Sequence, residues 1–329
     1  MGPLIESLLQ GIPLEPTPAQ ELMTHLLSGE ATDAQIAGVL IALKAKGTSG
    51  SELASFVRAL NAQALPVEHG LTTVVDSCGT GGGIPSFNIS TAAAVVAAAA
   101  GAYVGKHGNR AVTSTCGSAD VLEELGAKLE QTPERQSKIL RDCGLIFMFA
   151  PNHHPAMKHV GKVRRELGTR TVFNQLGPLA NPAAAQAQLI GTYDRELLEP
   201  MAQAAIELGR SRVLCVHAAD GLDEISPTHT TFGFFGDASG IRELEIGPFF
   251  KEADVSPGDS RSQNATILRE AISDASSPRC LAVLPSAGAV LWLAGLATSI
   301  NEGVLLARAT IADGGATRKL DSFIEASQQ

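Results

Sequence analysis

The chain has 329 residues, enough for one large domain or for a large domain with a small one. Its net charge of −9 argues against sequence-independent nucleic-acid binding, which needs a basic surface, but leaves a small anionic ligand possible. Five cysteines without a CxxC pair indicate free thiols and hence a reducing cytoplasm.

Nothing in the sequence favours a membrane location. The N-terminus has neither the basic nor the apolar region of a signal peptide. Two long uncharged runs, Ile84 to Gly105 and Leu281 to Thr298, are rich in small residues and are interrupted by Pro and Gly. We interpret both as buried helices.

The first part of the chain is predicted to be helical. Helices are expected from Thr17 to Gly29, from Thr32 to Gly47 and from about Ser51 to Ala64. The first two begin with threonine three residues before glutamine, the capping-box pattern, and end at glycine. A linker from Pro66 to Gly70 follows, so residues 1–69 are expected to form a helical domain.

From Thr72 onward, apolar and β-branched runs alternate with helical segments. Strands are expected at residues 72–75, 102–104, 145–149, 187–192 and 213–217. A helix is expected at residues 195–208, and the chain from Ser262 on is expected to be mostly helical. This alternation predicts an α/β domain with a central sheet over residues 70–329.

A glycine-rich loop follows the first of these strands. Four of the five residues from Gly79 to Gly83 are glycine, which leaves the backbone bare. Asn88, Ser90 and Thr91 are capping residues before a helical run from Ala92 to Ala100. A strand, a bare loop and a helix N-terminus together offer N–H groups to an anion. The spacings of Walker and dinucleotide-binding loops are both absent, and a purely structural turn is the alternative.

A second stretch, Lys106 to Arg110, is placed in the loop after the strand at residues 102–104. Two cations, with hydroxyl groups from Thr113 to Ser118, suit a polyanion. The alternatives are an ordinary solvated loop and, for Ser118, the N-cap of the next helix.

His153 and His154 begin a helix that carries Arg164 and Arg165 near its end. No third ligand stands at a usual spacing, so a metal site is disfavoured. An aromatic pocket with an arginine for a carboxylate fits better, although arginines at a helix end are often only partners of the helix dipole.

Adjacent carboxylates, Asp223 and Glu224, follow the strand at residues 213–217. The carboxyl end of a strand is where α/β sheets bind ligands, and carboxylate oxygens suit Mg²⁺. An acidic surface turn is the alternative.

Seven segments in this order resemble the anthranilate phosphoribosyltransferase family: GTGG, FNIST, KHGNR, CGSADVLEELG, FAPNHHPAMK, VRRELGTRTVFNQLGPLANP and DGLDEIS. The resemblance covers essentially the whole chain. It implies the nucleoside-phosphorylase-like fold, in which a small helical domain, joined by helices from about residues 165–185, precedes the larger α/β domain. It also implies a homodimer formed through the helical part and a possible association with anthranilate synthase.

By this resemblance the chain transfers phosphoribose from 5-phosphoribosyl-1-diphosphate to the amino group of anthranilate, in tryptophan biosynthesis. Lys106, Asn109 and Arg164 would be catalytic. Ser90, Asp223 and Glu224 would hold Mg²⁺. The substrate-binding residues implied are Gly79, Gly82, Gly83, Ser86, Asn88, Ser90, Thr91, Lys106, His107, Gly108, Asn109, Ser114, Ser118, His154 and Arg164.

The chain departs from the family in the glycine loop. An acidic residue usually follows GTGG and a threonine usually precedes FN, where this chain has Gly83 and Ser86. The loop between Gly79 and Asn88 is also one residue shorter. Two other functions stay open: a pyrimidine nucleoside phosphorylase of the same fold, and a non-catalytic nucleic-acid-binding relative, which should be more basic.

Overall fold

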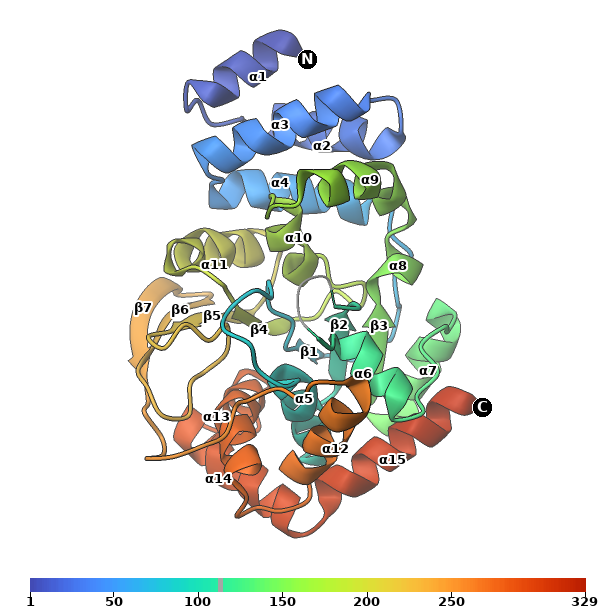
Figure 1. Cartoon of the computed structure of the whole chain (residues 1–329), viewed down its shortest axis with the longest axis vertical. Helices are drawn as coiled ribbons and strands as arrows, with labels where there is room; N and C mark the ends of the chain where they lie inside the picture. The colour runs from blue at the N-terminus through green and yellow to red at the C-terminus, as the bar shows by residue number, and fades with distance from the viewer. Residues whose placement is uncertain (112–114) are drawn as a thin grey trace.

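A stack of helices forms one end of the molecule, and a seven-stranded sheet with helices on its faces forms the other (Figure 1). The computed structural model describes residues 1–111 and 115–329. The N-terminus lies at the helical end and the C-terminus on the α/β part. The predicted combination of a helical domain and a larger α/β domain is therefore confirmed.

The helical end contains α1 (Gly2–Leu9), α2 (Pro16–Ser28), α3 (Asp33–Lys46) and α4 (Gly50–Asn61). Its core also includes buried residues of three later helices, α9 (Lys158–Leu167), α10 (Phe173–Leu179) and α11 (Leu198–Glu207). The segment that returns from the α/β part therefore packs into the helical core.

Local capping explains where these helices begin. The expected capping box at Thr32 is present, and Ser49 forms a second one with Glu52. The expected cap at Thr17 is wrong, because α2 begins at Pro16 and has Glu15 as its N-cap. Proline has no N–H to satisfy, so a first turn with two prolines needs no side-chain cap.

The sheet consists of β1 (Val75–Asp76), β2 (Val104–Gly108), β3 (Leu145–Phe149), β4 (Ala187–Gly191), β5 (Arg212–Ala218), β6 (Thr231–Asp237) and β7 (Gly240–Ile246). Their order is β3-β2-β1-β4-β5-β6-β7, and the pairings from β3 through β5 are parallel. The order reverses between β1 and β4. This switch point is where open α/β sheets form a ligand crevice at the carboxyl ends of their strands.

Two sequence predictions for the sheet need correction. The second strand begins at Val104 rather than Ala102, and it pairs with β3 through Gly108, so Lys106 and His107 lie in the strand and not in a loop. The first strand is only two residues long. The antiparallel hairpin of β6 and β7 was not predicted, because glycines interrupt the alternation in β6 and β7 is a charged, exposed edge strand.

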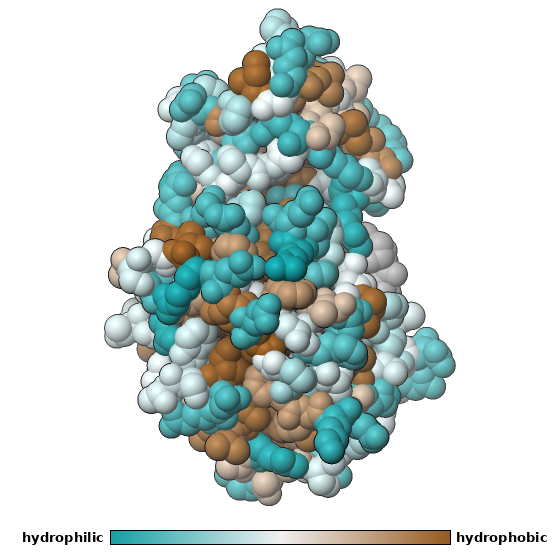
Figure 2. Space-filling view, turned by 90° about the vertical axis from the view of Figure 1, so that its left-hand side faces the viewer, coloured by the Kyte–Doolittle hydropathy of each residue, from teal (hydrophilic) through white to brown (hydrophobic). Residues whose placement is uncertain are grey.

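The α/β part contains α5 (Ile89–Ala99), α6 (Ser118–Glu124), α7 (Pro133–Cys143), α8 (Ala150–His153), α12 (Arg261–Ala271), α13 (Pro278–Leu293), α14 (Ile300–Ala312) and α15 (Gly315–Gln328), with short 3₁₀ turns at Pro155–Met157 and Arg195–Leu197. The face that carries β7 is mostly hydrophilic, with hydrophobic patches both at the helical end and over the α/β part (Figure 2).

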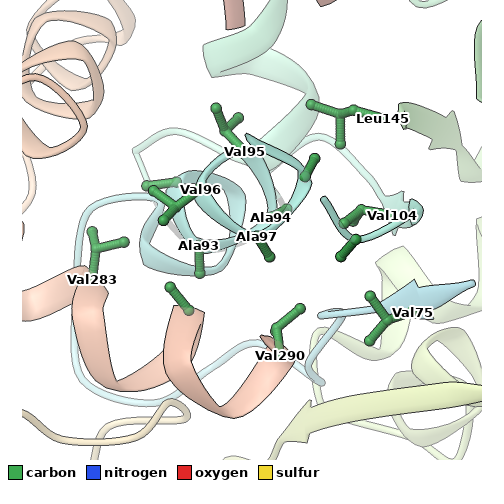
Figure 3. Packing of buried hydrophobic residues seen from close by; sticks show 14 of the residues in the cluster. Val75, Ala93, Ala94, Val95, Val96, Ala97, Val104, Leu145, Val283 and Val290 are labelled. Atoms are coloured by element: carbon green, nitrogen blue, oxygen red, sulfur yellow. The ribbon is translucent and has the colours of Figure 1, made fainter. Parts of the chain in front are cut away.

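The position of α5 follows from its composition. Its small, apolar residues are almost all buried, so the helix approaches both the sheet and α13 closely. Figure 3 shows it between Val75 and Val104 on one side and Val283 and Val290 on the other. The two uncharged runs therefore contain buried helices, as expected. Across residues 1–111 and 115–329, no helix has both the length and the apolar character that crossing a membrane requires.

A buried ion pair organises the helical end. The Glu52 carboxylate is fully buried and accepts hydrogen bonds from Lys46 Nζ at 2.8 Å and from the N–H groups of Leu14 and Ser49, each at 2.9 Å. Burial alone would raise the pKa of Glu52, but these hydrogen bonds hold that pKa below its usual value. One carboxylate thus joins the α1–α2 connection to α3 and α4.

We predict that Glu52→Gln destabilises the protein by about 3 kcal/mol, because it leaves the Lys46 charge buried without a partner. Since the folded pKa of Glu52 is lowered, its ionised form stabilises the fold above the unfolded pKa of 4.5 and that contribution is lost as the pH falls further. Urea unfolding at pH 7 and at pH 3 measures both effects. Glu21→Gln on the exposed face of α2 is the control, and an equal, pH-independent loss in the two variants would contradict the prediction.

Candidate active site

The loop from Ser77 to Asn88 leaves β1 at the switch point of the sheet. The Thr80 N–H donates to the Gly191 carbonyl at the end of β4, at 2.8 Å, and the Ile84 N–H donates to the Gly221 carbonyl at 3.0 Å. A Cβ on Gly79 would lie 2.7 Å from the Gly191 oxygen, so this close approach requires glycine. These two hydrogen bonds therefore hold the loop against the carboxyl ends of β4 and β5, which are neighbours in the sheet.

The same closeness explains why position 83 is a glycine. A Cβ on Gly83 would lie 2.6 Å from the Asp223 nitrogen and 2.8 Å from the Gly221 oxygen. A Cβ on Gly191 would collide with the Asp223 carbonyl. The loop thus packs directly against the segment that carries the two carboxylates, and position 83 has no room for a larger side chain.

The start of α5 presents polar groups that the protein does not fully use. Asn88 is the N-cap by position, but its amide donates to the Cys116 carbonyl at 3.1 Å instead of capping the helix. Asn88 Oδ1 and Thr91 Oγ1 are buried without a hydrogen-bond partner among the described residues. Buried polar atoms without partners at a helix N-terminus suit an anionic ligand that brings its own waters or metal ion.

Lys106 on β2 lies against this loop. Its side chain is buried, and Nζ donates to the Ser77 carbonyl at 3.0 Å and to Ser90 Oγ at 3.2 Å. Because side chains alternate along a strand, His107 faces the opposite side, where Nδ1 lies 2.9 Å from the Gly177 carbonyl of α10. Lys106 therefore faces the glycine loop, whereas the next residue, His107, faces α10.

His107 and His154 form a pair of neutral imidazoles. Their ring centroids are 5.3 Å apart, and His154 Nε2 lies 3.0 Å from the Ala180 carbonyl. Burial lowers the pKa of His107 to about 3 and that of His154 to about 4. Since one nitrogen of each ring donates to a carbonyl, the other, which has no partner among the described residues, is an acceptor. His153 instead binds the Leu65 carbonyl through Nδ1 at 2.8 Å, a structural role.

Arg164 lies in the last turn of α9, with its guanidinium carbon 5.2 Å from the centre of the Phe173 ring. Burial lowers the pKa of Arg164, and no carboxylate among the described residues pairs with it. Arg165 beside it is exposed. A partly desolvated guanidinium beside an aromatic ring suits an aromatic ligand that carries a carboxylate.

The end of β2 is locked against α6. The Asn109 carbonyl accepts hydrogen bonds from the Ala119 N–H at 3.1 Å and from Ser118 Oγ at 3.3 Å. Ser118 is the first residue of α6 rather than its expected N-cap, since Gly117 occupies that position and Asp120 accepts its N–H at 2.9 Å. Gly108 has no room for a Cβ beside Ser118. Ser86 lies half-buried in the glycine loop, and Ser114 falls outside the described residues.

Glu224 and Asp223 lie at the carboxyl end of β5, next to the glycine loop. Glu224 Oε2 accepts a hydrogen bond from Ser286 Oγ of α13 at 3.1 Å, and Ser90 also donates to this carboxylate. Burial, together with the neighbouring Asp223, raises the pKa of Glu224 to about 7. Burial also raises the pKa of Asp223, although the Gly83 N–H bonds to its carboxylate. In the described part of the chain, no group of three His, Cys, Asp or Glu residues could form a metal cage.

Sequence reasoning missed three residues at this site: Arg170, Gly191 and Ser286. Arg170 Nη2 donates to the Gly82 carbonyl at 2.6 Å, and its guanidinium carbon lies 4.2 Å from the centre of the Tyr193 ring. These residues come from three distant segments, and although Arg170 lies in one of the family segments, residue type alone does not assign any of the three to the site. Only the arrangement of the strands brings them to the glycine loop.

Two family models match the chain: the helical bundle domain of the glycosyl transferase family over residues 2–64, and the a/b domain of the same family over residues 71–317. The fold and the site thus define a two-domain glycosyl transferase. Anthranilate phosphoribosyltransferase from Symbiobacterium thermophilum is 42% identical over 99% of this chain and 97% of its own. The enzyme of that name from Thermoanaerobacter sp. is 41% identical over 95% of this chain and 94% of its own. The chain belongs to the anthranilate phosphoribosyltransferase family.

Solved structures agree. Anthranilate phosphoribosyltransferase from Thermus thermophilus superposes with a TM-score of 0.90 at 39% identity, covering 99% of both chains. The enzyme from Saccharomyces cerevisiae, in complex with PRPP and Mg, superposes with a TM-score of 0.88 at 27% identity over 98% of this chain and 96% of that one. The family suggested by the sequence motifs is therefore confirmed.

We predict that Glu224→Gln stabilises the metal-free protein at pH 8. The folded pKa of Glu224 is raised to about 7 from 4.5. Ionisation of Glu224 therefore destabilises the folded protein, and this destabilisation grows between pH 4.5 and pH 7 and reaches its full size above pH 7. The gain should be about 1 to 3 kcal/mol at pH 8 and vanish at pH 4.5, where the carboxyl group is neutral. Urea unfolding with a chelator present measures it. Glu252→Gln, at an exposed position, is the control, and a gain that persists at pH 4.5 would contradict the prediction.

Proposed function

We propose that this chain transfers the phosphoribosyl group of 5-phosphoribosyl-1-diphosphate to the amino group of anthranilate, giving N-(5-phosphoribosyl)anthranilate and diphosphate, the second step of tryptophan biosynthesis from chorismate. The observation that carries the proposal is the pair of consecutive β2 residues. Lys106 faces the glycine loop, while His107 faces α10, on whose first residue Arg164 packs. Two ligands of different chemistry therefore have adjacent places.

The diphosphate is proposed to lie on the glycine loop and the start of α5, with Gly79, Gly82, Ser90 and Thr91 around it. As the bond between C1 and the diphosphate breaks, negative charge develops on the leaving group. Lys106 and the backbone N–H groups stabilise that charge from fixed positions, so no reorganisation is needed during the step. Asn88, Gly83, Ser86, Gly108, Ser114 and Ser118 are proposed to complete this surface.

Anthranilate is proposed to lie between His107, His154 and Arg164. Arg164 holds the carboxylate, and the free acceptor nitrogens of the two imidazoles are suited to the N–H groups of the amine. Asn109, at the end of β2, orients the ring. An aromatic amine is already neutral at pH 7, so the site needs no strong general base, and orientation supplies much of the rate.

Mg²⁺ is the proposed metal, held by Ser90, Asp223 and Glu224. Two adjacent carboxylates suit a cation, and burial together with the charge of Asp223 raises the pKa of Glu224. The absence of a third such group among the described residues suits a cation that completes its shell with water and phosphate. When bound, the ion would neutralise charge on the diphosphate.

The organisation around the site is also proposed. Residues 1–69 form the helical domain, joined by residues 165–185, and residues 70–329 form the α/β domain. A homodimer through the helical part is supported by the exposed apolar side chains of Leu9, Ile12 and Ile41 at that end, where Figure 2 shows hydrophobic surface. All five thiols are free, which is consistent with the cytoplasm. Association with anthranilate synthase stays a prediction.

The direct test is the loss of anthranilate fluorescence with 5-phosphoribosyl-1-diphosphate and Mg²⁺. Phosphorolysis of thymidine or uridine in its place would favour a nucleoside phosphorylase. A salt-dependent shift of DNA in a gel would favour a nucleic-acid-binding relative.

We predict that Arg164→Ala raises the KM for anthranilate roughly 10- to 100-fold, as expected for the loss of one charge-assisted contact, and leaves the KM for the diphosphate substrate nearly unchanged. Steady-state kinetics with each substrate varied in turn measures both constants. Arg165→Ala, on the exposed side of the same helix turn, should behave like the natural chain. Equal increases in both constants would count against the assignment.

We predict that Asp223→Asn combined with Glu224→Gln abolishes most activity and blunts its dependence on Mg²⁺, because both metal carboxylates are removed. The chain should stay folded, since the substituted amides keep the shape of the buried carboxyl groups. Activity across a Mg²⁺ titration, with circular dichroism as the fold control, tests this. An unchanged Mg²⁺ dependence would refute the metal assignment.

A further inference from the structure

Arg170 lies in the short connection between α9 and α10 and reaches across to the glycine loop. Its Nη2 donates to the Gly82 carbonyl at 2.6 Å, and its guanidinium carbon lies 4.2 Å from the centre of the Tyr193 ring. The Tyr193 N–H in turn donates to Thr80 Oγ1 at 3.1 Å. Arg170, Tyr193 and the glycine loop therefore hold one another in place.

The hydrogen bond from Arg170 completes the fixation of one peptide group. Gly82 C=O and Gly83 N–H belong to the same peptide plane and point in opposite directions. Arg170 donates to the carbonyl, and the N–H faces the nearby Asp223 carboxylate, whose ionised form it favours. This plane is thus held at both ends, although Gly82 itself has a φ of 92°, in the region that glycine enters freely.

While this peptide plane is fixed, neighbouring N–H groups of the loop remain available to a ligand. The N–H groups of Thr80 and Ile84 donate to carbonyls of the protein, whereas those of Gly81 and Gly82 donate to no group within residues 1–111 and 115–329. A glycine loop without such a restraint samples many conformations, and binding would have to suppress them. A loop held in one conformation binds its ligand without that entropic cost.

We propose that Arg170 is a positioning residue for the diphosphate, which acts by holding the Gly82–Gly83 peptide and so keeping the free N–H groups of the loop in place for the substrate. This inference rests on the proposed function of the site. It adds a role for the connection after α9, the helix that carries Arg164. One segment then serves both substrates, through Arg164 at its start and Arg170 at its end.

The role needs arginine rather than any cation. A planar guanidinium stacks on Tyr193 and at the same time directs an N–H group at a carbonyl, which a lysine ammonium does not do. Arg170 is exposed, so its replacement leaves the core intact. The test is therefore the affinity for 5-phosphoribosyl-1-diphosphate with Mg²⁺, measured by titration calorimetry without anthranilate, and the KM for each substrate.

Arg170→Ala is expected to raise the Kd for 5-phosphoribosyl-1-diphosphate roughly tenfold, the size of one lost charge-assisted contact, with the KM for anthranilate changed less than twofold. Arg170→Lys should not restore the affinity. Tyr193→Ala should weaken binding in the same direction, Tyr193→Phe should not, and the double variant Arg170→Ala, Tyr193→Ala should bind no more weakly than Arg170→Ala alone. The matched control is Arg195→Ala, since Arg195 also stacks on an aromatic ring, Phe232, at 3.7 Å, but pairs with Glu243.

Three results would overturn the inference while leaving the proposed function intact: natural affinity in Arg170→Ala, full rescue by lysine, or additive losses in the double variant. Rescue by lysine would mean that charge alone matters, and additivity would mean that the two side chains act separately. A natural chain that binds no 5-phosphoribosyl-1-diphosphate would overturn the proposed function and this inference together.

Discussion

One buried carboxylate, Asp76, holds together the three segments from which the site is built. It lies at the end of β1, which pairs with β2 only through Val75 and Val104. Beyond that pair, side-chain hydrogen bonds take the place of backbone pairing between the strands. The Asp76 carboxylate accepts hydrogen bonds from the His107 N–H at 3.2 Å and from the Asn181 amide at 2.7 Å. Asn181 also donates to the Gly105 carbonyl at 2.8 Å. Side chains thus join β1, β2 and the segment after α10 where the backbone cannot.

This arrangement carries an electrostatic cost that the surroundings reduce. Burial raises the pKa of Asp76, whereas the charge of Lys106 and the hydrogen bonds from Asn181 and His107 favour its ionised form. Gln188 links the carboxylate to Arg210, whose Nε donates to the Gln188 oxygen at 2.9 Å. Lys106 and Arg210 are both close enough to interact with the Asp76 carboxylate, and their charges offset part of its desolvation. Lys106 thus interacts with Asp76 and also donates to the Ser77 carbonyl and to Ser90 beside the glycine loop.

Much of this fold could be predicted from the sequence, because the signals were local. The capping box at Thr32, the buried strand from Leu145 to Phe149 and the helical C-terminus are each fixed by neighbouring residues. The glycine loop and the Asp223–Glu224 pair could be chosen as candidates because residue type alone indicates the chemistry that they suit. The motifs of the family supplied the order in which these pieces belong to one site.

The contacts between distant segments could not be predicted from the sequence. Lys106 was expected in a loop, because glycines and cations resemble loop composition, whereas pairing with β3 makes the stretch a strand. Arg170 lies in one of the family segments, but its contacts could not be predicted from that segment, because its partners Gly82 and Tyr193 lie elsewhere in the chain. The hairpin of β6 and β7 depends on pairing with β5 rather than on its own alternation. Each of these is decided by register and packing, which only the folded chain specifies.

Two glycines of the site are also determined by contacts between distant segments. Gly79 is required by the Gly191 carbonyl, and Gly83 by the backbone around Asp223. Neither is explained by the conformation of its own residue, because the structure gives neither a positive φ. Glycine is needed at both positions because the loop packs directly against the backbone at the carboxyl ends of β4 and β5, where a Cβ does not fit.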